Sequence, residues 1–363
     1  MTDETARGVN VLVVADPGLP SRRVNSINDD LQEQLEKTFS PPVQLHTQTE
    51  VIRIRPDNTL DIGVASRIAE EYDRIDVVLL LTEIPRHHGK RPLIAEIFPE
   101  EKVGIISCPT LGAVATKGRI LTVFMACALR LMPVADDLDL NAHSLRWSRW
   151  SDPLDDTGHR QLTSNRMAGG FRSVLGMTMA NDPWRTAPRL SSALAAASAT
   201  GAFGIFYNSI WQMSNYLSTT RLLLIGLLAM AAMVFWLIVS NRLWDTPIKE
   251  RLSTVVLLYN LSTIATLFLC VLALYVTLVV LILLTSLVVI DPEFMSMILD
   301  QDASFVNYLD IAWLSAAMGV VAGALGSSFD SQTDMRRLTH GQRERQRQYS
   351  EDDDGSDQDT TSS

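Results

Sequence analysis

The chain has 363 residues, 47% of them hydrophobic and 20% charged, and its formal net charge is −10. Three cysteines, none of them in a Cys-x-x-Cys pair, exclude a disulfide framework and a zinc site of the usual spacing. The net charge says little about partners, because six acids fall within the last 14 residues.

Residues 1–8 are polar and are expected to be flexible. The first apolar run, Val9–Ala15, is too short for a secretory signal, so we expect the N-terminal half of the chain to stay in the cytosol. From residue 9 to residue 135, apolar runs alternate with amphipathic segments. The predicted strands are 9–15, 43–55, 76–81, 93–98 and 103–108, and the predicted helices are 22–39, 60–72 and 116–132.

Continuous apolar strands between amphipathic helices predict a Rossmann-like α/β domain over residues 9–135, with a mainly parallel sheet. Segment 93–98 is too close to residue 103 for a helical crossover. It is therefore expected to be an antiparallel edge or hairpin strand.

In open parallel sheets, ligands bind beyond the carboxyl ends of the strands. Three loops expected there, 16–23, 82–92 and 109–119, are rich in basic residues. Such side chains, together with helix N-termini, would suit a small anion such as a phosphate, a nucleotide or a lipid headgroup. The predicted anion-binding residues are Arg22, Arg23, Arg86, His87, Lys90, Arg91, Thr110, Gly112 and Lys117.

The alternative is that these loops are solvated, or attracted without specificity to an anionic membrane. Asp16 and Glu83 are weak catalytic candidates, since carboxylates at strand ends more often cap helices or loops. The chain lacks the dinucleotide fingerprint, the P-loop and the usual metalloprotease and hydrolase motifs. No motif therefore requires a cofactor, and no metal site is predicted at His87 and His88.

Residues 136–190 are predicted to be a linker of mixed charge. Its last part, 164–180, has the pattern of a short amphipathic helix rich in methionine. We expect this juxtamembrane helix either to lie at the membrane surface or to pack against the α/β domain.

Residues 191–329 hold a series of apolar segments. About 20 apolar residues in a helix suffice to cross a bilayer core of roughly 30 Å. The third segment is long for one crossing, but it contains no Gly or Pro, so one long helix is expected and a broken helix is the alternative. The predicted crossings of this all-α transmembrane bundle are 191–211, 221–241, 253–290 and 309–329.

The loops between these segments differ in charge. Loop 242–252 has three basic residues, whereas loop 291–308 has four acids and no Lys or Arg. Cytoplasmic loops are enriched in Lys and Arg, so we expect a multi-pass protein of the cytoplasmic membrane with both termini in the cytoplasm. The tail 330–363, basic and then acidic, is expected to be disordered. Its arginines directly follow a membrane segment, so nucleic acid is not an expected partner.

The last apolar segment contains the small residues Gly319, Gly323 and Gly326. Small residues at this spacing let helix backbones approach closely. They predict either a homo-oligomer contact or packing against other helices of the same chain, and we favour the second.

Six passages carry a resemblance: ADPGLP, LLTEIPRHHGKRPLIAEI, IISCPTLGA, RLSSALAAASATGAFGIFYNSIWQ, LYNLSTIATLF and VVIDP. Over about residues 9–329 they make the chain similar to a family of uncharacterised actinobacterial membrane proteins. The resemblance implies a cytosolic α/β head on a four-helix membrane domain. It implies no particular activity.

These observations predict an integral membrane protein whose head acts as a sensor or scaffold. Its expected partners are the lipid bilayer, a small anion and, through the last helix, further copies of the chain. One alternative is a membrane-bound enzyme that uses Asp16 or Glu83 on an anionic or lipid-linked substrate at the inner leaflet. Another is a small transporter or channel, which the scarcity of polar residues at mid-bilayer disfavours.

Overall fold

A computed structural model describes residues 8–39, 42–52, 72, 74–89, 91–114, 116–132, 143–154, 157–183, 191–245 and 253–326. Contacts divide the chain into two compact units. Of the described residues, the first unit holds those up to Ala180 together with 253–259. The second unit holds 181–245 and 260–326.

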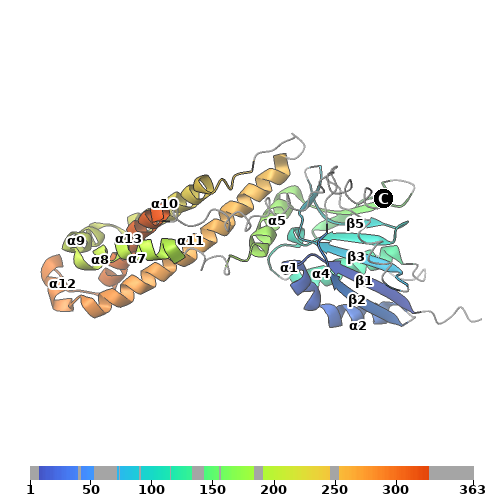
Figure 1. The fold of residues 1–363 in the computed structure, drawn as a ribbon, viewed down its shortest axis with the longest axis horizontal. Coiled ribbons are helices and arrows are strands. Elements are labelled where there is room, and N and C mark those ends of the chain that lie inside the picture. Colours follow the sequence, from blue (N-terminus) through green and yellow to red (C-terminus); the bar gives the residue numbers. More distant parts are fainter. Residues whose placement is uncertain are drawn as a thin grey trace, which may run out of the picture. The chain divides into compact units, whose positions relative to one another are not determined.

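The first unit is built on one mixed sheet (Figure 1). In space the strands follow the order β2, β1, β3, β6, β5, β8 and β7, and β4 pairs with β5. Their bounds are β1 (Val9–Ala15), β2 (Val43–Thr49), β3 (Val77–Thr82), β4 (Arg86–His88), β5 (Arg91–Phe98), β6 (Val103–Ser107), β7 (Ser148–Trp150) and β8 (Arg160–Ser164).

Strands β2, β1, β3 and β6 are parallel, with Val13 of β1 lying between Thr47 and Leu79. Strand β5 pairs antiparallel with β6, and β8 and β7 continue the antiparallel half. The predicted parallel core is therefore confirmed, and so is the antiparallel direction of β5. Of the two predicted roles of β5, the hairpin with β6 is observed, and the edge position is wrong, because β8 lies beyond it.

The region predicted to be a linker, 136–190, supplies both β7 and β8. The sheet therefore extends past the predicted domain boundary at residue 135. An edge at β5 would expose a row of unpaired backbone groups, and pairing with β8 satisfies them. The region also supplies helix α5 (Arg166–Ala180).

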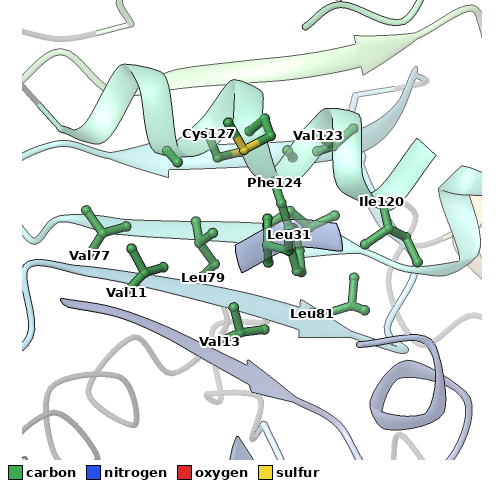
Figure 2. Packing of buried hydrophobic residues seen from close by; sticks show 14 of the residues in the cluster. Val11, Val13, Leu31, Val77, Leu79, Leu81, Ile120, Val123, Phe124 and Cys127 are labelled. Carbon is green, nitrogen blue, oxygen red and sulfur yellow. The ribbon is translucent and has the colours of Figure 1, made fainter. Parts of the chain in front are cut away.

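Helices α2 (Asn28–Thr38) and α4 (Thr116–Leu131) cover one face of the sheet. Figure 2 shows Leu31 of α2 and Phe124 of α4 packed over the strand residues Val13 and Leu79. A second apolar cluster, which includes Leu12 and Leu80, lies on the opposite face. Burial of both faces explains why β3 and β6 are unbroken apolar runs.

The helix predicted over 22–39 is two helices, α1 (Leu19–Asn25) and α2. They are separated at Ser26 and Ile27, and the turn places Ile27 in the core with 1% of its surface exposed. Asp29 and Asp30 then fall in the first turn of α2, where negative charge favours a helix start. The helix predicted over 60–72 lies outside the described residues except for Tyr72, which is not helical.

Helix α5 packs on the 3₁₀ turn η1 (Pro109–Leu111). A Cβ on Gly176 would lie 2.2 Å from the carbonyl oxygen of Pro109, so only glycine permits this approach. Farther along α5, Met177 packs with Leu258 and Tyr259, near the start of α11 (Ser253–Val289). One of the two predicted placements of this helix, against the α/β domain, is thus observed.

The second unit is helical. Its elements are α7 (Ser191–Gly201), α8 (Phe203–Phe206), α9 (Asn208–Tyr216), α10 (Thr219–Ser240), α11 from Asn260 onward, α12 (Pro292–Leu299) and α13 (Phe305–Gly326). Within the described residues, three helices are long and apolar enough to cross a membrane: 219–240, 256–289 and 305–324. The segment predicted over 253–290 is one continuous helix (Figure 1).

The first predicted crossing, 191–211, is not one continuous helix. It breaks at Ala202 and Tyr207 into α7, α8 and α9. The indole N–H of Trp211 donates to the carbonyl oxygen of Gly204 (2.9 Å), which ties α9 back onto α8. The four-crossing topology and the orientation of the termini therefore stay predictions.

The small residues of α13 pack within the chain. A Cβ on Gly319 would lie 2.5 Å from the carbonyl oxygen of Ala197, and one on Gly323 would lie 2.8 Å from that of Ala193. Both partners belong to α7. The glycine face of α13 is occupied by α7, so a homo-oligomer contact through this helix would need another of its faces; that contact stays a prediction.

Candidate anion-binding site

The carboxyl ends of the parallel strands are joined by the side chain of Asp16, which directly follows β1. Asp16 is fully buried. One of its carboxylate oxygens accepts from the backbone N–H of Ile52 (2.9 Å). The other accepts from the Thr82 hydroxyl (2.8 Å) and the backbone N–H of Glu83 (2.9 Å). This geometry makes Asp16 a connector of strand ends, and it favours the capping alternative over a catalytic acid.

Arg23 extends this buried region toward η1. Its guanidinium donates to the Sγ of Cys108 (3.0 Å) and to the carbonyl oxygen of Gly112 (3.3 Å). Burial raises the pKa of the Cys108 thiol, and the charge of Arg23 only partly offsets this. Cys108 is therefore a thiol at neutral pH and is not poised as a nucleophile. Thr110 is also buried, and its hydroxyl donates to the carbonyl oxygen of Ser107 (2.7 Å).

The structure distributes the predicted anion-binding residues over two places. Arg23, Thr110 and Gly112 lie at η1, whereas Arg86, His87 and Arg91 belong to the β4–β5 hairpin. Arg22 and Lys117 are exposed on α1 and α4, and Lys90 lies outside the described residues. Arg23 and Thr110 have internal partners and hold the loop itself, so neither is free to meet a ligand.

On the hairpin, Arg86 is bound to a carboxylate. It forms an ion pair with Glu96, which also accepts from Gln161 (2.7 Å) and contacts His159 (2.7 Å). His87 is different, because neither of its ring nitrogens, both buried, has a hydrogen-bond partner among the described residues. Burial lowers the pKa of His87 to about 4, so the imidazole is neutral at physiological pH. Arg86 and His87 therefore offer little free positive charge to an anion, whereas Arg91 of the same hairpin is exposed.

A second set of basic side chains surrounds Gly112. A Cβ on Gly112 would lie 3.2 Å from the Nη1 of Arg119 and 3.6 Å from the Cβ of Arg172. The Trp147 ring lies 4.0 Å from the guanidinium carbon of Arg172 and 5.9 Å from that of Arg119, measured to its centroid. Gly112, Arg119, Trp147 and Arg172 form what we call the Gly112 site.

Local structure fixes each member of the Gly112 site. Gly112 has a φ of 88°, which L side chains rarely adopt, and it ends η1. Arg119 lies in the first turn of α4 and donates from its Nη1 to the carbonyl oxygen of Leu111 (2.7 Å). Arg172 comes from α5, which the close contact of Gly176 holds against η1. Three distant segments therefore converge on one glycine.

The charge of the Gly112 site is unbalanced. Within the described part of the chain, neither Arg119 nor Arg172 forms an ion pair. The Nη1 of Arg172 is buried and has no hydrogen-bond partner there. Burial and the neighbouring charge of Arg172 both lower the pKa of Arg119. An anion between the two guanidinium groups would supply hydrogen-bond acceptors and remove their repulsion.

The predicted anion site combined three loops, of which 109–119 contains Gly112, and it did not include Arg172 and Trp147. Both fall in the region interpreted as a linker, and their contact with Gly112 depends on the packing of α5. One signal was available: two tryptophans, Trp147 and Trp150, stand in an otherwise polar stretch. Each is covered by an arginine, since Arg130 lies 4.5 Å from the ring of Trp150.

No group of three or more His, Cys, Asp or Glu side chains that could hold a metal ion occurs among the described residues. Comparison of the chain with protein-family models, with curated proteins and with solved structures finds no match. The resemblance to an actinobacterial membrane-protein family therefore stays a prediction.

Proposed function

We propose that this chain is a multi-pass membrane protein whose cytoplasmic α/β domain acts as a sensor or scaffold and binds a small anion at the Gly112 site. The observation that carries the proposal is the buried Nη1 of Arg172, which has no acceptor among the described residues and lies beside a second arginine. A buried guanidinium N–H without an acceptor is costly, and a second arginine beside it adds repulsion, so the arrangement points to a negatively charged ligand.

The membrane part of the proposal is supported by three helices that are long and apolar enough to cross a bilayer. The basic loop 242–252 and the acidic loop 291–308 support a cytoplasmic position for both termini. The N-terminus of α4 adds a partial positive charge beside Arg119, which favours phosphate and carboxylate groups.

Pyrophosphate is a suitable probe, because it has several acceptor oxygens for two guanidinium groups. The test measures the thermal unfolding midpoint of the full chain in nanodiscs of neutral lipid. It compares a solution of pyrophosphate with a solution of potassium chloride of equal ionic strength. A ligand present at about 100 times its dissociation constant stabilises the folded state by roughly 2.7 kcal/mol. We expect pyrophosphate, and not chloride, to raise the unfolding midpoint.

The matched variants are Arg172→Gln, which removes the unpaired cation, and Arg146→Gln, which removes an exposed arginine beside Trp147. Arg146→Gln should keep the pyrophosphate shift and Arg172→Gln should lose it. An equal shift in both variants would place the anion elsewhere, and no shift in the unmodified chain would contradict the proposal.

A further inference from the structure

Helix α5 has an exposed apolar face beside the Gly112 site. Met167, Phe171 and Leu175 are 84%, 66% and 36% exposed. They are spaced four residues apart, so they share one side of the helix. Residues that face the sheet and η1, such as Gly169 and Gly176, lie on the opposite side and are buried. We call Met167, Phe171 and Leu175 the α5 stripe.

Basic residues border the α5 stripe. Arg166 and Arg172 belong to the same helix, and α5 contains no Asp or Glu. Lys117 of α4 is exposed near the start of that helix, and Val114 in the loop before it is 74% exposed. A helix with a large apolar side chain at each turn and cations alongside is typical of segments that lie in the headgroup region of a membrane.

The neighbour of α5 in the first unit is itself part of a candidate membrane span. Leu258 and Tyr259 of α11 pack with Val174 and Met177 of α5. The span that includes them runs from Val256 to Val289. Its 34 residues are about 51 Å long, well over the roughly 30 Å of a hydrocarbon core. A helix longer than the core has ends outside it, and Leu258 and Tyr259, which α5 contacts, are at the beginning of this span.

We infer that the α5 stripe is a membrane-docking surface whose occupant is the headgroup layer of an anionic lipid bilayer. Phe171 and Met167 enter the interface, and the exposed Arg166 and Lys117 meet lipid phosphates. Lys and Arg side chains near an anionic membrane surface attract the protein to it. The inference rests on the proposed membrane location of the chain, but it does not require a soluble anion at the Gly112 site.

The test uses a spin label at Phe171→Cys in the full chain, because the native cysteines among the described residues are buried. Lys37→Cys is the matched control, since Lys37 is exposed on α2, away from α5. Electron paramagnetic resonance measures collisions of each label with oxygen, which concentrates in lipid, and with a water-soluble nickel chelate. Both proteins are measured in nanodiscs of phosphatidylcholine and of phosphatidylcholine mixed with phosphatidylglycerol.

The expected result is that the Phe171→Cys label gains oxygen collisions and loses nickel collisions relative to Lys37→Cys, most strongly in the anionic discs. A water-like label in both membranes overturns the inference, and so does a label shielded from both reagents, which would indicate a protein cover. Lipid contact without any dependence on phosphatidylglycerol overturns the role of the basic residues. Pyrophosphate binding reports the Gly112 site separately, so either proposal can fail alone.

Discussion

The guanidinium carbon of Arg172 lies 4.0 Å from the centroid of the Trp147 ring, and the Nη1 of the same arginine is buried without a hydrogen-bond partner in the described structure. The aromatic ring contacts the guanidinium group and leaves its Nη1 without an acceptor. Trp147 and Arg172, both from the region predicted to be a linker, therefore belong to one basic site.

Trp147→Leu should weaken anion binding without removing the charge. A cation–π contact at a partly exposed position contributes about 0.5–1 kcal/mol, which corresponds to roughly two- to fivefold in affinity. Titration calorimetry with pyrophosphate would measure the change. Trp150→Leu removes the other arginine-covered tryptophan and serves as the control, because Trp150 contacts Arg130 rather than the Gly112 site. Equal effects of both substitutions would mean that Trp147 has no specific role.

Gly112→Ala should destabilise the first unit and disturb the site. Alanine at a φ of 88° is strained, and its Cβ would lie 3.2 Å from the Nη1 of Arg119. We expect a loss of about 1–2 kcal/mol in the free energy of unfolding.

Gly118→Ala is the matched control for this substitution. Gly118 lies inside α4, and a Cβ there meets nothing within 4 Å. Because alanine favours helix, this variant should be about 1 kcal/mol more stable than the unmodified chain. Chemical denaturation compares the three proteins, and a Gly112→Ala variant as stable as Gly118→Ala would contradict the assigned backbone strain.

These residues also show how far the sequence predicts the structure. Strands β1, β3 and β6 are nearly continuous apolar runs, because both of their faces are buried. Such runs can be recognised in the sequence, so these strands could be predicted. Strand β8 reads Arg-Gln-Leu-Thr-Ser and is defined by its partner, since Gln161 bonds Glu96 far away in the chain. The local sequence of β8 does not show that it pairs with β5. The two strands beyond β5, β8 and β7, were therefore not predicted.

In the candidate site, too, residues of one loop could be predicted and residues brought in by long-range packing could not. Gly112 was among the predicted anion-binding residues because its loop, 109–119, is basic and follows a predicted strand. Arg172 could not be assigned from sequence, because its position depends on glycine contacts of α5 with β5 and η1. The hairpin residue Arg86 was misleading, because the partner that neutralises it, Glu96, lies on the strand after the loop.

Glu96 should make the stability of the first unit dependent on pH. Burial opposes its ionisation, but the charge of Arg86 and hydrogen bonds from Gln161 and His159 outweigh burial, so the pKa of Glu96 is lowered. A carboxylate with a lowered folded-state pKa stabilises the protein above its unfolded pKa of about 4.3. That contribution is lost as the pH falls through the folded pKa.

Glu96→Gln should remove this acid-sensitive contribution and leave Arg86 without its carboxylate. We expect the free energy of unfolding at neutral pH to fall by about 3 kcal/mol, as for a broken buried pair. Glu33→Gln, which breaks an exposed pair with Lys37, should have little effect. Urea unfolding at neutral pH and at about pH 3 would measure the free energy of unfolding of both variants. Equal free energies for the two variants would be inconsistent with a structural role for Glu96.

In the second unit, Gly226→Val should separate α10 from its neighbours. A Cβ on Gly226 would lie 2.8 Å from both the Trp313 Nε1 and the Tyr275 hydroxyl. Those two side chains join three helices, since Trp313 donates to the carbonyl oxygen of Leu222 and Tyr275 to that of Trp313, both at 2.8 Å. Overpacking of this kind costs about 1–3 kcal/mol.

Ala231→Val adds similar volume on an exposed position of the same helix and is the control. Thermal unfolding in nanodiscs should show a lower midpoint for Gly226→Val and little change for Ala231→Val. Equal midpoints would argue that these three helices do not meet at Gly226.

Calorimetric titration of pyrophosphate into the full chain in neutral-lipid nanodiscs would measure whether Arg119 and Arg172 together hold an anion. We expect binding of one pyrophosphate per chain, lost in both Arg119→Gln and Arg172→Gln and retained in Arg146→Gln. Full binding by either of the first two variants, or no binding by the unmodified chain, would contradict this expectation.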